Sequence, residues 1–129
     1  MSYLPKLDPE LHAGTYAFTT VPLTASITGL DVVATMREAE GLTLVLPEHQ
    51  AKQRGFDLLF RCAWITLRVT SALEAVGLTA AFARALADES IACNVIAGAH
   101  HDHLFVAVDR AADALQCLQT LQQRARESS

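Results

Sequence analysis

The sequence has few of the features that mark membrane, secreted or nucleic-acid-binding proteins. No apolar run approaches the roughly 18 residues that a membrane helix needs, and residues 1–14 lack the basic-then-apolar pattern of a signal peptide. Lysine and arginine form no cluster, and the formal net charge is −4. A surface that neutralises nucleic-acid phosphates is therefore not expected. We expect a soluble, cytoplasmic protein with no nucleic-acid partner and no membrane partner.

Cysteine is scarce and widely spaced. The three cysteines are Cys62, Cys93 and Cys117, and no CxxC pair occurs. An odd number without close pairs argues against a disulfide framework and against a structural zinc site built from paired ligands. Cys62 and Cys93 lie in or beside apolar segments, so we interpret them as reduced, buried small hydrophobes.

Motifs of catalysis and of phosphate binding are missing as well. The chain contains no GxGxxG, GK[ST], GxSxG, HxxxH or HExxH pattern. Glu38 and Glu40 are close in sequence, but two acids beside a turn are typical of a solvated loop. We therefore expect no catalytic residues and no cofactor, and we do not expect an enzyme.

Apolar residues, by contrast, are plentiful. They make up 51% of the 129 residues, whereas charged residues make up only 19%. This supply is enough for the core of one compact domain, or of two very small ones that share a core. A small chain this apolar covers part of its surface most easily by pairing with a copy of itself, which predicts a homodimer.

The first half of the chain shows the patterns of three strands and a short helix. The segment TYAFTTV (15–21) alternates in polarity and is rich in β-branched and aromatic residues, as strands are. Residues 32–38 and 42–46 flank Gly41, whose backbone freedom suits a tight hairpin turn. The segment PEHQAKQRG (47–55) begins with proline and ends with glycine, which predicts a short helix between them.

The second half opens with a buried strand at 63–69, followed by a helix. Thr70 or Ser71 is a suitable N-cap, and Glu74 follows at the spacing of a capping box, so the helix is expected to run from there to about Asp88. Its expected buried face recurs every three or four residues. That face comprises Leu73, Val76, Ala80, Ala83 and Leu86 or Ala87.

Two further strands, at 91–97 and 103–108, precede a final helix that begins near Asp109. The second half thus has the order β-α-β-β-α, and the first half contains a similar β-β-α run. A βαββαβ unit needs a fourth strand, which the end of the chain does not provide. Because an unpaired sheet edge invites aggregation, we expect strand 15–21 to serve the second half, or the two halves to share strand 63–69.

Three segments make a family resemblance specific: ATMREAEGLTLVLP (34–47), WITLRVTSALEAVGLTAAFARAL (64–86) and NVIAGAHHDHLFV (94–106). They resemble the ACT domain, a small βαββαβ module that binds amino acids in metabolic enzymes. Over about residues 8–120 the chain is similar to small stand-alone bacterial proteins made of tandem ACT-like halves. The resemblance implies an α+β, ferredoxin-like fold with antiparallel sheets. Its parts would be a degenerate N-terminal ACT-like half (1–60) and a C-terminal ACT-like domain (61–129) interleaved with strand 15–21.

The resemblance also implies a ligand site. In ACT domains the ligand lies where the loop before the first helix of one unit faces another unit, and the unpaired amides of a helix start attract a carboxylate. Gly77 allows close approach, Asn94 would supply an amide, and Asp102 corresponds to an acidic residue that holds the ligand's polar end in a related eukaryotic amino-acid sensor. The expected ligand-binding residues are Thr70, Ser71, Leu73, Glu74, Ala75, Val76, Gly77, Asn94 and Asp102.

The function implied is that of a non-catalytic regulatory or sensor protein for an amino acid or a similar small metabolite. Two alternatives stay open. One is a structural interaction module with a vestigial pocket. The other is a metal site in the segment HHDH (100–103), where His101 and His103 would share a strand face. Consecutive histidines do not supply the two separated pairs that structural zinc prefers, so we expect no metal and a solvated hairpin with His103 beside the sheet edge.

Overall fold

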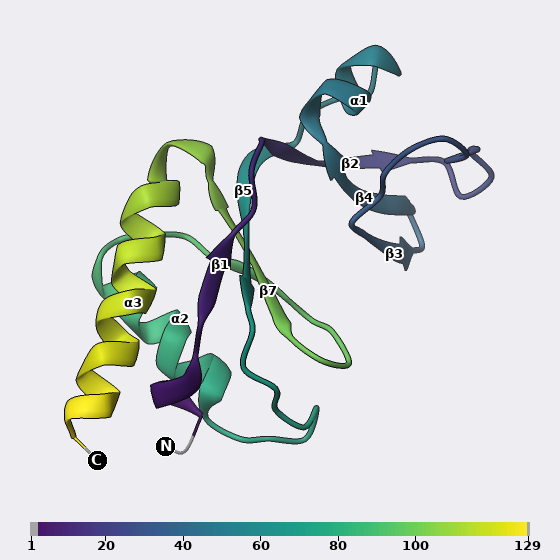
Figure 1. Cartoon of the computed structure of the whole chain (residues 1–129). Coiled ribbons are helices and arrows are strands. Elements are labelled where there is room, and N and C mark those ends of the chain that lie inside the picture. The colour runs from purple at the N-terminus through teal and green to yellow at the C-terminus, as the bar shows by residue number, and fades with distance from the viewer. Residues whose placement is uncertain (1–2, 129) are drawn as a thin grey trace. The chain divides into compact units, whose positions relative to one another are not determined.

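The structure is a computed structural model that describes residues 3–128 (Figure 1). The chain forms two compact units, which are described separately. The N-terminal unit is Ala13–Cys62, and the C-terminal unit combines Met1–His12 with Ala63–Ser129. No helix among the described residues is both long enough and apolar enough to cross a membrane.

The N-terminal unit is a small antiparallel sheet with one short helix. Its strands are β2 (Tyr16–Val21), β3 (Ala34–Glu38), β4 (Gly41–Pro47) and the first residues of β5 (Phe60–Leu67), in the order β3-β4-β2-β5. Helix α1 (Glu48–Gln53) follows β4 directly, as the proline and glycine at the ends of segment 47–55 predict.

Two local features fix this unit. Gly41 opens β4, and a Cβ atom there would lie 2.8 Å from the carbonyl oxygen of Val21, so only glycine fits the turn without a shift. The side chain of Gln50 in α1 holds the segment between β2 and β3. Its Nε2 donates to the Asp31 carboxylate at 2.9 Å, and its Oε1 accepts from the backbone N–H of Asp31 at 2.8 Å.

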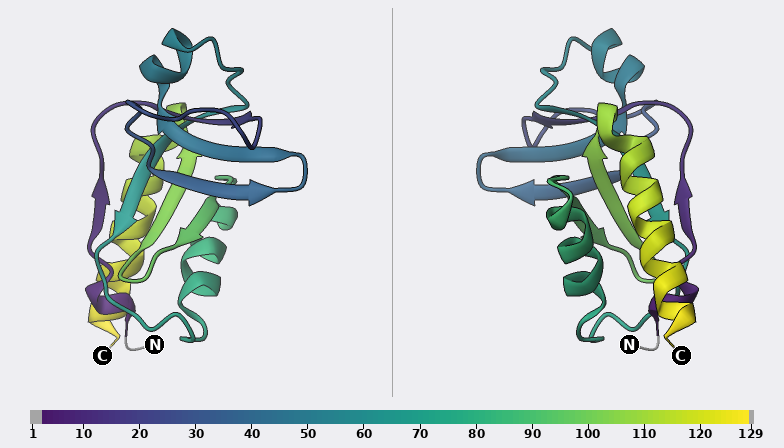
Figure 2. Two further views of the ribbon diagram at one scale, coloured as in Figure 1. Left: turned by 90° about the vertical axis from the view of Figure 1, so that its right-hand side faces the viewer. Right: turned by 90° about the vertical axis from the view of Figure 1, so that its left-hand side faces the viewer.

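The C-terminal unit has the alternation of strands and helices that the sequence predicts. Its elements are β1 (Pro9–Leu11), β5, α2 (Leu78–Asp88), β6 (Asn94–Ala97), β7 (Asp102–Ala107) and α3 (Ala111–Glu127), with short 3-10 helices η1 (Leu4–Lys6) and η2 (Val108–Arg110). The strand order is β1-β5-β7-β6, and α2 and α3 lie on the same side of these strands (Figure 2). This is the α+β, ferredoxin-like arrangement with an antiparallel sheet that we expected.

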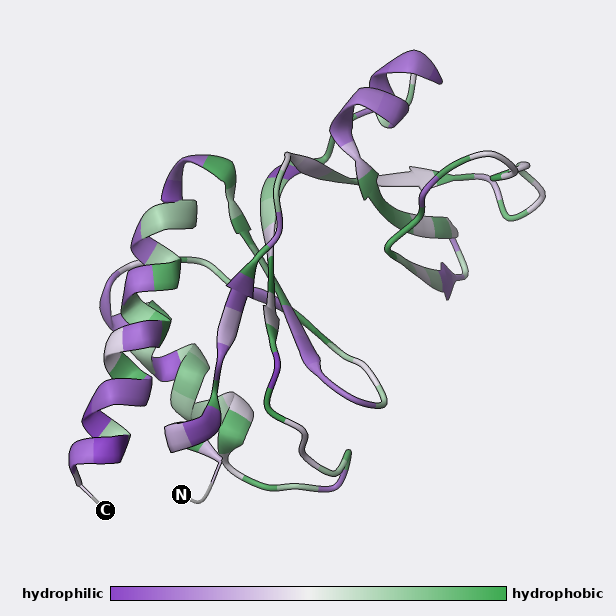
Figure 3. Ribbon diagram, in the orientation of Figure 1, coloured by the Kyte–Doolittle hydropathy of each residue, from purple (hydrophilic) through white to green (hydrophobic). Residues whose placement is uncertain are grey.

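The core of the C-terminal unit lies between the sheet and the two helices. Successive side chains of a strand point to opposite faces, so Ile65 and Leu67 of β5 pack with Phe82 and Leu86 of α2, all fully buried. Apolar and polar stretches alternate along α3, as an amphipathic helix over a core requires (Figure 3). Trp64 and Thr66 alternate with Ile65 and Leu67 along β5, so their side chains belong to the other face.

The fourth strand of this sheet is shorter than expected and comes from a different place. Pro9–Leu11 pairs with residues 65–67 in antiparallel register. Tyr16–Val21 pairs instead with β4 and with Phe60–Cys62 in the N-terminal unit. Segment 15–21 thus pairs within the N-terminal unit, whereas β5 contributes residues to both units, and the interleaving of the two domains stays a prediction. The division at residues 60 and 61 stays a prediction.

Helix α2 begins later than the sequence analysis expects. It starts at Leu78, after Gly77 in a left-handed conformation (φ +99°), and no side chain caps it. Thr70 and Ser71 are therefore not its N-cap. Leu73 and Val76, expected on the buried face, are 72% and 91% exposed. The apolar positions keep a helical spacing across residues 73–83, but residues 70–77 form turns and irregular backbone that end at the left-handed Gly77, so the spacing there does not correspond to a helix.

Candidate functional site

A small cavity of about 60 Å³ lies at the N-terminus of α2, within the C-terminal unit. The loop between β5 and α2 forms one wall, the first turn of α2 forms the second, and the turn between β6 and β7 forms the third. No side chain caps the start of α2, and the other two segments enclose the space in front of it.

The helix end makes one side of this cavity electropositive. Gly77 is the N-cap, and its carbonyl accepts the first helical hydrogen bond, from Ala81 N–H at 3.0 Å. The amides of Leu78 and Thr79 precede that bond and have no partner within the helix. The first turn carries no acidic residue. These amides and the helix dipole favour an anionic group such as a carboxylate.

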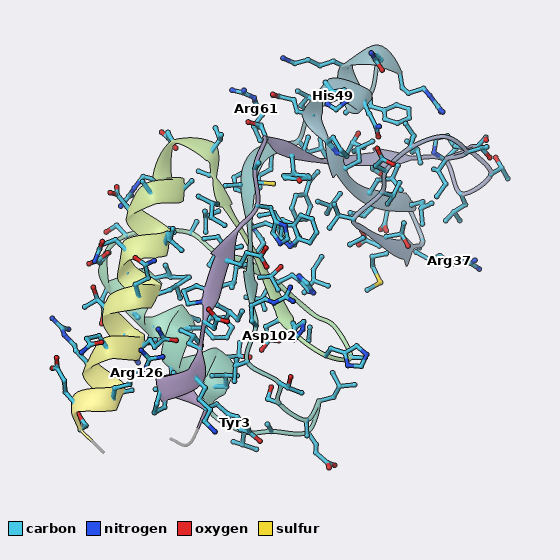
Figure 4. The ribbon with its side chains drawn as sticks, viewed as in Figure 1. Tyr3, Arg37, His49, Arg61, Asp102 and Arg126 are labelled. Carbon is cyan, nitrogen blue, oxygen red and sulfur yellow. The ribbon has the colours of Figure 1, made fainter. Side chains whose placement is uncertain are left out.

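The wall formed by the β6–β7 turn carries an acid. Asp102 is the first residue of β7 and lines the cavity (Figure 4). Burial raises the pKa of its carboxyl, and the neighbouring His103 acts in the opposite direction. The turn beside it is closed by the Gly98 N–H, which donates to the His101 carbonyl at 2.9 Å. The cavity thus has a positive end and a negative end, which is the charge pattern of a zwitterionic amino acid.

The structure brings part of the expected ligand set together. Ser71, Leu73, Ala75 and Asp102 line the cavity, and Gly77 sets the backbone turn at its edge. The remaining expected residues do not line it: Thr70, Glu74 and Val76 lie elsewhere on the loop, and Asn94 lies at the start of β6 opposite Phe105. Ligand binding by any of these residues stays a prediction.

Several lining residues were not expected. Thr79, Gly98 and His101 also face the cavity. The sequence does not point to Thr79 because its capping pattern predicts a helix start six or seven residues before Leu78, where α2 begins. His101 belongs to the histidine cluster that the sequence analysis singled out but assigned to a solvated hairpin. Gly98 could have been expected there from its position, because it begins the turn between the two predicted strands.

The three neighbouring histidines have three different surroundings. His100 is exposed and His101 lines the cavity. His103 points to the other face of the sheet, where its Nδ1 lies 3.1 Å from the indole nitrogen of Trp64 and 3.0 Å from the hydroxyl of Thr66. Across residues 3–128, no three His, Cys, Asp or Glu side chains are arranged to hold a metal ion.

A larger groove of about 330 Å³ lies between α2 and α3. Arg84 and Asp88 of α2 and Arg124 of α3 line it, together with the largely buried Cys117. Its size alone makes it the stronger candidate for a ligand. However, it lies along helix bodies, where backbone amides are already paired, and its charged groups Arg84, Asp88 and Arg124 are exposed side chains. We therefore give more weight to the smaller cavity, where fixed backbone amides face an acid.

Comparisons with known proteins agree with this architecture. Two models, each described as an ACT domain, match residues 2–63 and 59–120. A crystal structure of a Vibrio cholerae protein of unknown function, described as a possible transport protein, is 47% identical, with 93% of each chain covered and a TM-score of 0.83. The chain belongs to the ACT domain family.

More distant solved structures share the ACT fold alone. The ligand-free regulatory subunit of aspartate kinase from Thermus thermophilus has a TM-score of 0.65 at 8% identity, covering 88% of this chain and 95% of that one. A structure of aspartokinase alpha and beta subunits gives 0.66 at 10% identity, with the same coverage. No curated protein shows significant sequence similarity to the chain. ACT domains are regulatory rather than catalytic modules, and this chain carries two in tandem.

Proposed function

We propose that this tandem ACT protein is a non-catalytic regulatory protein that binds an amino acid in the cavity at the start of α2. The observation that carries the proposal is that Asp102 lines the same cavity as Leu78 and Thr79, whose amides have no partner within the helix. The ACT family and the similarity in fold to aspartate kinase regulatory subunits support the same class of ligand.

Each end of the ligand has a partner of opposite charge. The α-carboxylate accepts hydrogen bonds from the amides of Leu78 and Thr79 at the positive end of the helix. The α-ammonium lies against the Asp102 carboxylate, a charge-assisted contact that is strengthened by partial burial. The cavity of about 60 Å³ accommodates these polar groups, and the ligand's side chain extends towards Leu73, which is 72% exposed.

We propose further that the protein is a homodimer and that it is located in the cytoplasm. Leu73 and Val76 are exposed large apolar side chains on the loop that precedes α2. Exposed apolar residues next to a binding site are typical of surfaces that a partner covers, and a second copy would bury them. Light scattering after size-exclusion chromatography measures the mass in solution, and Val76→Ser is expected to shift it towards the monomer. A monomer at all concentrations would contradict this part.

Thermal shift with each of the twenty amino acids tests the ligand class. An amino acid that binds only the folded state stabilises it by about 2.7 kcal/mol at one hundred times its Kd, so the melting temperature rises with concentration. We expect Asp102→Asn to abolish most of that rise. Asp88→Asn is the matched control, because Asp88 lies in the α2–α3 groove instead. No shift with any amino acid, or a shift lost only in Asp88→Asn, contradicts the proposal.

A further inference from the structure

A hydrogen-bonded chain of side chains joins three strands of the C-terminal unit around Trp64. His12, directly after β1, stacks on Trp64 with ring centroids 3.6 Å apart, and its Nε2 lies 2.7 Å from the hydroxyl of Thr66. That hydroxyl is 3.0 Å from Nδ1 of His103 in β7, and the indole N–H of Trp64 donates to the same Nδ1 at 3.1 Å. Thr66 is 1% exposed.

The indole bond fixes where the proton of His103 lies. An indole N–H only donates, so Nδ1 of His103 accepts and carries no proton. The Thr66 hydroxyl has one proton, which goes either to Nε2 of His12 or to the same Nδ1 as the indole. In the second case the indole and the hydroxyl share the one lone pair of Nδ1.

The two histidines therefore respond differently to acid. A second proton on His12 places a cation on the face of Trp64, which is favourable, and the Thr66 oxygen can accept a hydrogen bond from the charged ring. A second proton on His103 must go to Nδ1, where it meets the indole N–H donor to donor. His103 is neutral in this arrangement, and protonation breaks its bond to Trp64.

His103 also lies beside the turn that forms one wall of the cavity. A Cβ atom on Gly98 would lie 3.4 Å from Nε2 of His103 and 3.0 Å from the His101 carbonyl, so the ring lies directly beside the turn. Gly98, His101 and Asp102 all line the cavity. Asp102 directly precedes His103 in β7, so the two residues are neighbours in the strand that borders the cavity.

We propose that His103 is a proton-sensitive latch: when neutral it fastens the β6–β7 turn to β5 through Trp64 and Thr66, and its protonation releases the turn and weakens ligand binding. The effect on the ligand rests on the proposed function, whereas the release of Trp64 does not.

The charged surroundings support this direction. Burial lowers the pKa of His103, and the charges of His101, His12 and Arg68 lower it further, against the opposing effect of Asp102. Burial lowers the pKa of His12 as well, with Glu10 opposing and Arg68 adding to the effect. Because the folded-state pKa lies below the unfolded value of about 6.5, the stabilisation is complete above pH 6.5 and is lost as the pH falls through the folded-state pKa.

The fluorescence of Trp64, the one tryptophan in the sequence, reports on this latch directly. We expect a change in emission with a midpoint below pH 6.5 in the full-length protein. His103→Gln removes the transition, while His12→Gln keeps it, and His49→Gln, an exposed residue of the N-terminal unit, leaves it unchanged. No transition in the folded wild-type protein, or a transition that follows His12 instead of His103, overturns the proposal.

The wild-type protein offers a second measurement that no folding defect can obscure. The 15N chemical shifts of the His103 ring distinguish its tautomers, and we expect the proton on Nε2 at pH 7.5. A proton on Nδ1 at that pH overturns the proposal, because the Trp64 bond then cannot form.

The ligand effect is measured by titrating an amino acid found in the thermal-shift screen at pH 7.5 and at pH values below the His103 midpoint. Affinity is expected to fall roughly tenfold per pH unit well below that midpoint if the neutral form alone binds. In His103→Gln the fall is expected to be shallower, because the Asp102 carboxyl, whose pKa burial raises, still loses its charge as the pH falls. Equal affinity of the wild type across this range overturns the latch while leaving the proposed function intact. If no amino acid binds at any pH, the proposed function fails, and the fluorescence transition still decides the latch.

Discussion

The imidazole of His12 lies flat on the indole of Trp64, with ring centroids 3.6 Å apart and planes inclined by 14°. The backbone N–H of His12 also donates to the Trp64 carbonyl at 2.9 Å. These contacts hold the N-terminal segment against β5. We predict that His12→Ala lowers the free energy of unfolding by about 1 kcal/mol, from the lost stacking and the lost bond to Thr66. Urea denaturation measures this, and His49→Ala, at an exposed position, should change it by much less. An equal effect of both substitutions would argue against the stack.

Removal of residues 1–12 is predicted to unfold the C-terminal unit. The deletion takes away β1, which pairs with residues 65–67, and Leu7, which is fully buried in the core of that unit. It also leaves one edge of β5 unpaired. Near-ultraviolet circular dichroism of Trp64 should lose its native signal in the chain 13–129. A native signal from Trp64 in that chain would show that β1 is dispensable.

Thr19 is predicted to lower the stability of the N-terminal unit. Its side chain is 0% exposed, and its hydroxyl has no hydrogen-bond partner among the described residues. A buried hydroxyl without a partner costs free energy, and an apolar group of the same shape removes that cost. We expect Thr19→Val to raise the free energy of unfolding by about 1 kcal/mol. Thr20→Val, at the exposed next position, is the control and should have little effect. A loss of stability in Thr19→Val would mean that the hydroxyl is satisfied.

The cysteine thiols are predicted to be inert in the folded protein. Burial raises the pKa of Cys62 to about 12 and that of Cys93 to about 11. Burial and the nearby Glu89 carboxylate raise the pKa of Cys117 to about 11. All three thiols are therefore protonated at pH 8, and a protonated thiol is a poor nucleophile. Reaction with a disulfide reagent at pH 8 should be slow until denaturant is added. Rapid labelling of one cysteine in the native protein would identify a reactive site that this account lacks.

The elements that sequence patterns predict well are those whose pattern is local. Residues 15–21 and 103–108 alternate or are continuously apolar, and both correspond to strands, β2 and β7. The glycine of the 38–42 turn was also predicted for its backbone freedom, and the close approach of the Val21 carbonyl explains why it is needed there.

What could not be predicted depends on contacts between distant residues. β1 has three residues, one of them proline, so it has no periodicity to detect, and only its partner at 65–67 makes it a strand. The start of α2 depends on the left-handed conformation of Gly77, which overrides a helical spacing of apolar residues. The link from His12 to His103 through Thr66 spans most of the chain.

The lining of the cavity could be predicted only in part for a related reason, and ligand binding there stays a prediction. Ser71 and Asp102 were placed together because the family resemblance supplied their relationship, and the structure brings both to one cavity. Asn94 was placed beside them by strand position alone. It pairs opposite Phe105 at the far end of β6 from the turn, and therefore lies away from the lining.

The most direct test of the account is a titration of 15N-labelled protein with the amino acids, read from its backbone amide signals. The account predicts that the largest shifts occur at Leu78 and Thr79, whose amides receive the carboxylate, and at Asp102 across the cavity. Shifts concentrated instead at Arg84 and Arg124 would place the ligand in the α2–α3 groove, and an unchanged spectrum with every amino acid would leave the cavity without its proposed ligand.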